Sequence, residues 1–332
     1  MIHSSNRRKF IVILCLLITG LLLIVVFTAK TSEKTAEEPY QEFRDILGEN
    51  VYGYQLGFAN PSYGPLGEKL IWNSENDKLE LSFTNASTDG EFLLKILWNF
   101  EEIEFSVDNG KASRQYIFTS DYSKTMDWKI SFPDDLSTSS EDYLGNLTAI
   151  VFIEPNIHQK DAVVYEHKNY GLAAVHHVFT SEKFDSFNSN HLFRNTNYQQ
   201  FEEYEGEFND LNVTTVEDDL LSNPSPSLQV GSGEMVKLNF LAGASIEDIN
   251  EYILVALLGN NQVDLNGQRY LPIQLTTNPA SGQIIPQTGT VNFQAPSEPG
   301  NYEFIMYQFP VEREILGLSL VENSFRLTIV VE

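Results

Sequence analysis

An uncharged apolar segment near the N-terminus, residues 10–29, constrains this chain more than any other feature. At about 1.5 Å per residue, a helix of this length spans about 30 Å, which is the thickness of a bilayer's hydrocarbon core. Within lipid the backbone must satisfy its own hydrogen bonds, so a single segment of this kind can only cross as a helix. The sequence therefore predicts a transmembrane signal-anchor helix at 10–29.

The basic residues Arg7, Arg8 and Lys9 precede this segment and are expected to stay on the cytoplasmic side. Residues 1–9 would then form a cytoplasmic tail, and everything after the helix would be extracellular. A cleaved signal peptide is the alternative, with an apolar region of about 7–15 residues and small residues at positions −3 and −1. Ala29 suits −1 but Phe27 does not suit −3. The predicted localisation is therefore the cell membrane, single-pass, with a cytoplasmic N-terminus.

The chain has 332 residues and a formal net charge of −25, which limits its partners. Nucleic acid and anionic headgroups would be repelled by such a surface, whereas cationic partners would be attracted. The alternative interpretation is that the charge only keeps an exposed protein soluble. The only cysteine, Cys15, lies inside the apolar segment, so the outer part has no disulfides and depends on packing. This combination favours the surface of a bacterium with a single membrane, hence a Gram-positive cell.

From about residue 69 onwards, apolar and polar residues alternate with a period of two. About seven such runs, separated by turn residues, predict a first antiparallel β-sandwich over residues 50–182, behind a stalk at 30–49. Trp98 and Trp128 lie in register with apolar neighbours. Both tryptophans are therefore predicted to belong to the core.

Three local pairings are expected within this sandwich. Runs 79–84 and 92–100 flank a Ser-Thr-Asp-Gly turn and predict a hairpin. The Asn-Gly pair at 109–110 favours positive φ and a tight return of the chain. Runs 162–167 and 172–179 predict one further hairpin, appended to the sandwich.

Residues 183–225 are predicted to form an acidic linker between two domains. No basic residue occurs between Arg194 and Lys237, and the segment ends in an Asn-Pro-Ser-Pro-Ser sequence. Proline stiffens such a segment, and its acidic composition is typical of a solvated chain.

Residues 226–332 return to strand-like runs. The stretch Phe293-Gln-Ala-Pro-Ser-Glu-Pro-Gly-Asn-Tyr-Glu-Phe304 and the closing run Phe325–Val331 resemble bacterial immunoglobulin-like domains. The resemblance implies a second sandwich, with Tyr302 at the structural position of the tyrosine corner. It implies no activity, because this architecture hosts many functions. The predicted fold class is thus all-β, with two immunoglobulin-like antiparallel β-sandwiches behind an N-terminal transmembrane helix.

Two groups of aromatic residues are candidates for ligand binding. Tyr63 and Trp72 flank a loop rich in proline and glycine and could form an exposed platform for sugars. Phe201, Tyr204 and Phe208 alternate with acidic residues and could form a contact surface, with a flexible solvated linker as the alternative.

Metal binding and catalysis are not expected. Five of the six histidines fall within residues 158–191, but in the predicted hairpin His167 and His176 lie about 13 Å apart, too far to share an ion. We therefore assign no metal and no cofactor. Glu102 and Glu104 have a spacing that would suit a glycosidase pair, yet alternating glutamates are also typical of a solvated strand face.

These observations predict a membrane-anchored extracellular binding or scaffolding protein of the bacterial cell envelope, not an enzyme. Its partner, a protein or a cell-wall glycan, is not identified by the sequence. One alternative is an accessory or sensor subunit of a membrane complex. A second alternative is a cell-wall glycan hydrolase that uses paired carboxylates.

Overall fold

The computed structural model is all-β, and every regular element within its described part is a strand. The chain divides into two compact units, Met1–Gly53 and Tyr54–Glu332, and all described residues belong to the second. The expected anchor at 10–29 and stalk at 30–49 lie outside the described residues. No helix in the described part is long and apolar enough to cross a membrane. The structure describes residues 54–58, 62–64, 67–71, 79–132, 143–158, 171–179, 198–215, 220–221, 227–244, 250–311 and 321–332.

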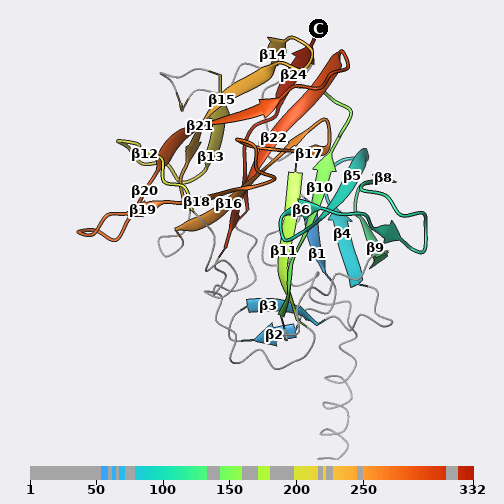
Figure 1. Cartoon of the computed structure of the whole chain (residues 1–332). Coiled ribbons are helices and arrows are strands. Elements are labelled where there is room, and N and C mark those ends of the chain that lie inside the picture. The colour runs from blue at the N-terminus through green and yellow to red at the C-terminus, as the bar shows by residue number, and fades with distance from the viewer. Residues whose placement is uncertain are drawn as a thin grey trace, which may run out of the picture. The chain divides into compact units, whose positions relative to one another are not determined.

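Two sheets form an N-terminal sandwich (Figure 1). The four-stranded sheet has the order β1 (Tyr54–Phe58), β4 (Leu79–Asn85), β9 (Lys124–Ser131) and β7 (Ser106–Val107). The seven-stranded sheet has the order β2 (Ser62–Gly64), β3 (Gly67–Ile71), β11 (Gly171–Phe179), β10 (Tyr143–Ile153), β5 (Gly90–Trp98) and β6 (Glu101–Glu102), with β8 (Tyr116–Ser120) beside β5. Phe83, Phe92 and both predicted core tryptophans, Trp98 and Trp128, are buried between the sheets, which confirms that prediction.

The expected hairpin between runs 79–84 and 92–100 is wrong. β4 pairs with β1 and β9, whereas β5 pairs with β10, β8 and β6 in the opposite sheet. The turn between them carries the chain across the sandwich, and buried Asn85 holds it by donating to the carbonyls of Thr88, Ser120 and Asp121. Alternation identified the buried face of each strand but not its partner.

The tight return at 109–110 is confirmed. Asn109 has a φ of 66°, and Phe105 and Ser113 exchange backbone hydrogen bonds of 2.9 Å across the turn. The appended hairpin is not seen. Run 162–167 lies outside the described residues, and β11 is instead an interior strand, antiparallel to β10 and parallel to β3.

A C-terminal sandwich follows, again with one four-stranded and one seven-stranded sheet. The four-stranded sheet has the order β12 (Glu202–Glu203), β21 (Gln287–Gln294), β15 (Met235–Ala242) and β13 (Leu211–Thr214). The seven-stranded sheet has the order β14 (Ser227–Val230), β24 (Leu327–Val331), β22 (Gly300–Pro310), β16 (Glu251–Leu258) and β17 (Asn261–Val263), with β18 (Leu271–Gln274) beside β16 and β23 (Glu322–Asn323) beside β22. A small two-stranded sheet joins β19 (Thr276–Thr277) to β20 (Ile284–Ile285).

The tyrosine corner expected at Tyr302 is present. The Tyr302 hydroxyl donates to the carbonyl of Glu298, four residues upstream, at 2.9 Å. Below it, the stacked rings of Phe293 and Phe304 fill the space between the sheets at 4.8 Å between centroids. The C-terminal sandwich therefore has the immunoglobulin-like architecture that the resemblance implied.

Residues 201–214 differ from the expected acidic linker, because β12 and β13 are strands of the C-terminal sandwich. Leu211 and Val213 are buried in its core, so this part of the segment cannot be solvated chain. Glu202 and Glu203 remain exposed at the sheet edge. The linker was predicted from acidic composition, which describes the exposed glutamates correctly. Composition does not reveal that the side chains of Leu211 and Val213 pack into the core.

The two sandwiches pack against each other through their seven-stranded sheets. A third apolar cluster joins β5, β10 and β11 to β16 and β22, and we call this contact the junction. It exists because β5 and β16 carry apolar side chains on both faces. On each strand, one face packs into the core of its own sandwich and the other face packs into the junction. Its buried side chains are those of Leu93, Leu97, Phe100, Ile150, Phe152, Val175, Ile253, Val255, Leu257, Ile305, Tyr307, Phe309 and Val311.

Candidate functional site: the junction between the sandwiches

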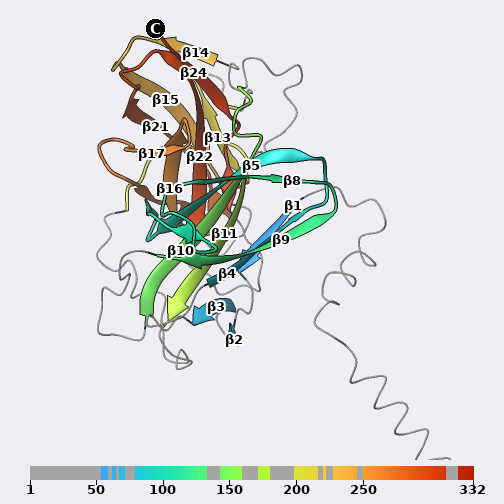
Figure 2. The same ribbon diagram turned by 90° about the vertical axis from the view of Figure 1, so that its right-hand side faces the viewer.

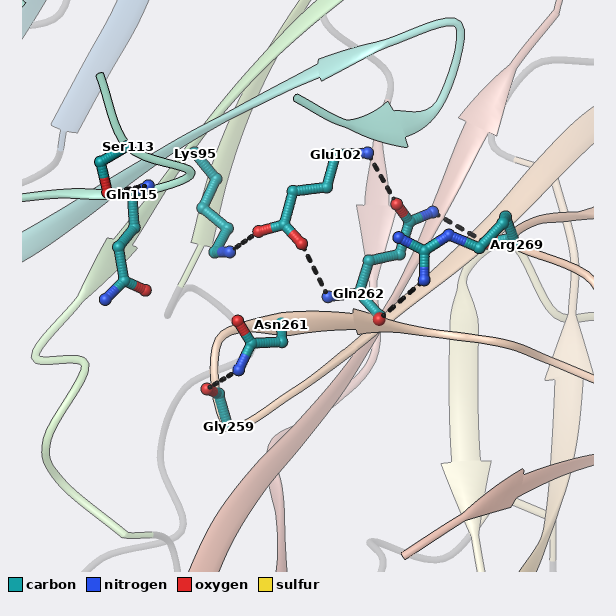
Figure 3. Close-up of polar contacts among 8 residues, drawn as sticks. All are labelled: Lys95, Glu102, Ser113, Gln115, Gly259, Asn261, Gln262 and Arg269. Atoms are coloured by element: carbon teal, nitrogen blue, oxygen red, sulfur yellow. Dashed lines mark hydrogen bonds and ion pairs between the residues drawn. The ribbon is translucent and has the colours of Figure 1, made fainter. Parts of the chain in front are cut away.

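A buried ion pair lies at one end of the junction (Figure 3). The Lys95 ammonium on β5 binds the Glu102 carboxylate on β6, and their side chains are 0% and 3% exposed. Positive φ angles at Asn99 and Phe100 turn the chain sharply, so that β6 folds back along β5 and Glu102 pairs with Leu97. The tight turn thus brings the two charges together from neighbouring positions in the sequence.

Gln262 on β17 joins this ion pair to the C-terminal sandwich. The Glu102 backbone N–H donates to Gln262 Oε1 at 2.8 Å, and the Gln262 N–H donates to Glu102 Oε2 at 3.4 Å. Gln262 Nε2 donates to the carbonyls of Phe100 and Arg269, both at 2.8 Å. One buried amide therefore links β6, β17 and the strand connection after β17, as Figure 3 shows.

Burial governs the electrostatics of Lys95. It lowers the pKa of the ammonium to about 7, the Arg114 guanidinium acts in the same direction, and the Glu102 carboxylate opposes both. A lysine with such a pKa could act as a nucleophile if a substrate could reach it. The side chain has no exposed surface, so its chemistry is confined to holding Glu102 and the junction.

A second polar cluster lies where β22 and β24 meet the end of β10. Arg326 is 3% exposed, and its Nη2 and Nη1 atoms donate to the carbonyls of Ile153 and Glu154 at 2.5 and 3.1 Å. Nearby, Glu303 Oε1 accepts from the Thr328 hydroxyl at 2.6 Å and lies 3.2 Å from His158 Nδ1. Charged groups of this cluster thus reach from one sandwich to the other, as Glu102 does through Gln262.

The first pair of predicted ligand contacts is only partly described. Tyr63 lies on β2 opposite Glu68, and Trp72 lies outside the described residues. An exposed platform formed by these two rings stays a prediction.

Phe201, Tyr204 and Phe208 are all half-buried, and a contact surface formed by them stays a prediction. The Phe201 ring packs edge-on against Phe240 at 5.0 Å between centroids, and it covers Gly289 so closely that a Cβ there would meet it. Tyr204 and Phe208 are half-buried, and the Tyr204 N–H donates to the Pro286 carbonyl. Phe201 is therefore partly buried and packs against the core of the C-terminal sandwich.

The predicted carboxylate pair is not assembled. Glu102 is buried with Lys95, whereas Glu104 lies beyond the end of β6 and is exposed. Alternation placed both on one solvated face, but β6 ends at Glu102, so the spacing rule does not extend to Glu104.

The histidines are dispersed. His158 lies beside Glu303, while His176 and His177 are consecutive residues of β11, opposite Leu147 and Asn146 of β10. His167 and His191 lie outside the described residues. Across the described ranges, no group of three or more His, Cys, Asp or Glu side chains could hold a metal ion.

Lys95, Gln262 and Arg326 were not singled out by the sequence, although a signal was present. Lys95 is the single charge in the run Phe92–Trp98, which is apolar on both strand faces. A strand of this kind is buried on both sides, so a charge within it must have a partner. No comparable signal pointed to Gln262, which follows the polar residues Asn260 and Asn261.

Comparison with known proteins adds little to this description. No protein-family model and no curated protein matches the chain. Similar solved structures include the Escherichia coli chaperone DraB, with 9% identity, a TM-score of 0.27 and coverage of 85% of this chain and 98% of that chain. The C-terminal domain of the Streptococcus pyogenes antigen I/II-family protein AspA has 9% identity, a TM-score of 0.21 and coverage of 85% and 100%. At such TM-scores neither similarity supports a conclusion about function.

Proposed function

We propose that this chain is a membrane-anchored extracellular binding or scaffolding protein of the bacterial cell envelope, with no catalytic role. The observation that carries the proposal is the closed junction. Its charged side chains, Lys95, Glu102, Glu303 and Arg326, are buried and engaged in holding two sandwiches together. Sandwiches coupled in this way present their loops and edges at a fixed spacing, which reduces the ordering cost of binding a partner.

The proposed location is supported by the sequence. The apolar segment 10–29 follows Arg7, Arg8 and Lys9, as in a signal anchor with a cytoplasmic N-terminus. The remainder of the chain lacks cysteine and is strongly acidic, which suits an exposed protein stabilised by packing alone. A Gram-positive envelope is the setting that we propose.

Proximity labelling on intact cells tests the function. The full chain, carrying a labelling enzyme at its C-terminus, should mark a reproducible set of envelope proteins or wall-attached proteins. The same chain without residues 1–29 should appear in the medium and still bind those partners after purification. Loss of every partner on this deletion would instead favour the alternative of an accessory subunit that assembles laterally in the membrane.

A glycan-release assay separates binding from hydrolysis. Whether or not it binds purified wall glycans, the full chain should release no soluble fragments from them. Release of fragments that is abolished by Glu104→Gln and retained in the control Glu80→Gln would contradict the proposal. Glu80 is a suitable control because it is also exposed and lies on β4 in the opposite sheet of the same sandwich.

A further inference from the structure

β8 forms an open sheet edge in the N-terminal sandwich (Figure 2). Among the described strands it pairs only with β5, from Gly90 opposite Ser120 to Leu94 opposite Tyr116. Its other edge therefore presents backbone donors and acceptors that no described strand takes up. Such an edge is a template for pairing with a further strand.

The sequence of β8 lacks the usual protection against pairing. From Gln115 to Ser120 it contains no charged residue, proline or glycine, and its Tyr-Ile-Phe-Thr centre has high β propensity. The open part of β9, in contrast, carries the exposed charges of Lys124, Asp127 and Lys129. Charges on an edge strand discourage pairing with another chain.

Several other described edges are protected by their short length or by a covering segment. β2, β7, β12 and β17 have only two or three residues each. All four residues of β13 are buried, and Gln199 hydrogen-bonds to the outer edge of β18. Among the described edges, β1 (Tyr54–Phe58) and β14 (Ser227–Val230) are likewise uncharged, but β8 differs from them in carrying an exposed large apolar side chain.

Apolar side chains are exposed along the same edge. Ile117 is 50% exposed, and Tyr122, just beyond the end of β8, is 58% exposed. Ile117 lies opposite Leu93, which is buried in the junction, so it extends the apolar junction face to the surface. A strand added at this edge would cover Ile117 and complete that face.

The charges at the two ends of β8 identify the occupant. Exposed Lys111 and Arg114 precede the strand, and exposed Asp121 follows it. An antiparallel copy of the same strand would bring Arg114 of each chain to the end where Asp121 of the other lies. The uncharged centre would meet itself without repulsion, in spite of the net charge of −25 on each chain.

We propose that β8 is a self-association edge, at which two copies of this chain pair antiparallel and join their seven-stranded sheets into one. The contact is isologous, since each copy contributes the same strand to a two-fold axis. This inference goes beyond the proposed function, because it depends on neither the envelope partner nor the location of the chain.

Sedimentation analysis of the full chain over a range of concentrations tests the inference. The wild type should form a dimer, and Ile117→Lys should weaken it by about 100-fold, because a charge enters the symmetric contact twice. Met235→Lys is the matched control, since Met235 is also an exposed apolar strand residue, at 63%, but lies on β15. It should leave the dimer unchanged, which also separates β8 pairing from association through residues 10–29.

Charge reversal provides a second measurement that does not depend on Ile117. Arg114→Glu and Asp121→Arg should each weaken the dimer, and the double variant should restore it, since opposite charges again meet at both ends. A monomeric wild type, or a dimer that none of these variants changes, would overturn the inference. The inference would also be overturned if the wild type were monomeric alone and crosslinked through position 117 to a different envelope protein. The strand that pairs with β8 would then belong to another protein.

Discussion

Lys95 illustrates how a single residue can determine whether two domains stay together. A buried ammonium costs several kcal/mol of desolvation, and only a well-placed carboxylate offsets this cost. Glu102 supplies the carboxylate, and its own backbone and second oxygen are held by Gln262 of the other sandwich. The ion pair is thus satisfied only while the junction is closed.

Replacing Lys95 should therefore destabilise the protein strongly. Lys95→Met leaves the Glu102 carboxylate buried without its cation, which should lower the free energy of unfolding by about 3–5 kcal/mol. The double variant Lys95→Met with Glu102→Gln should recover most of this loss. Chemical denaturation measures both. The control Lys129→Met removes an exposed ion pair with Glu80 at 4.0 Å and should cost at most about 1 kcal/mol. An equal loss of stability in Lys95→Met and Lys129→Met would contradict a stabilising role for the buried Lys95–Glu102 pair.

The same residue predicts how stability depends on pH. Lys95 has a pKa of about 7 in the folded protein, below the ordinary value of 10.5, so the unfolded chain binds more protons between these values. Stability should therefore rise as the pH increases from about 7 towards 10. Above that, Tyr252 and Tyr307 act in the opposite sense, because burial raises their pKa values. Urea midpoints measured between about pH 7 and pH 10 should rise in the wild type and much less in Lys95→Met. If the midpoints of the two proteins rose equally with pH, Lys95 would not be the titrating group.

At the scale of single elements, the short strand β17 joins the two sandwiches through one amide. Gln262 is buried while its neighbour Asn261 is exposed. Gln262→Ala should leave the carbonyls of Phe100 and Arg269 without their donor and cost about 1–3 kcal/mol. Hydrogen exchange should show faster opening of β6 and β17 before the rest of either sandwich.

Asn261→Ala is the matched control for this element. Its amide donates only to the Gly259 carbonyl, at 3.3 Å, so its loss should change stability by less than about 0.5 kcal/mol. If both substitutions opened β6 and β17 equally, the hydrogen bonds of Gln262 would not be what couples these strands.

The sequence predicted the strands better than their partners. Alternation over Leu79–Phe83 and the apolar run at Phe92–Trp98 located β4 and β5 and their buried faces, because side chains on a strand alternate with a period of two. It could not show that these neighbours belong to opposite sheets, since alternation carries no information about which strand supplies the hydrogen bonds.

The candidate site was harder to predict than the fold. Glu102 was interpreted as part of a solvated strand face because Glu102 and Glu104 alternate with apolar residues in the sequence. Its true surroundings depend on Gln262, a residue far away in the sequence that only tertiary packing brings close. The contact of Phe201 with the Phe240 ring could not be predicted for the same reason, since Phe240 lies on another strand.

For the whole molecule, the junction predicts that the two sandwiches unfold together. Its apolar side chains are as deeply buried as those of either sandwich core, so separation would expose them to water. Calorimetry should give a single transition for residues 54–332 in the full chain. Leu257→Asp, which places a charge in the junction, should split or broaden this transition.

Met235→Asp is a suitable control for that measurement, because Met235 is an exposed apolar strand residue, at 63%, outside the junction. It should leave one transition at nearly the same temperature. Two well-separated transitions in the wild type would show that the sandwiches are thermodynamically independent despite their contact.

Arg326 has a consequence for the order in which the molecule is made. It precedes β24, which leaves the ribosome after every other described strand, yet it binds the carbonyls that end β10. During translation the N-terminal sandwich is synthesised first. Its junction face, on β5, β10 and β11, therefore stays exposed to water until β16 and β22 have been synthesised and β24 has joined them. A pause within the C-terminal sandwich would leave that face exposed for longest, which makes it the step of synthesis most prone to aggregation.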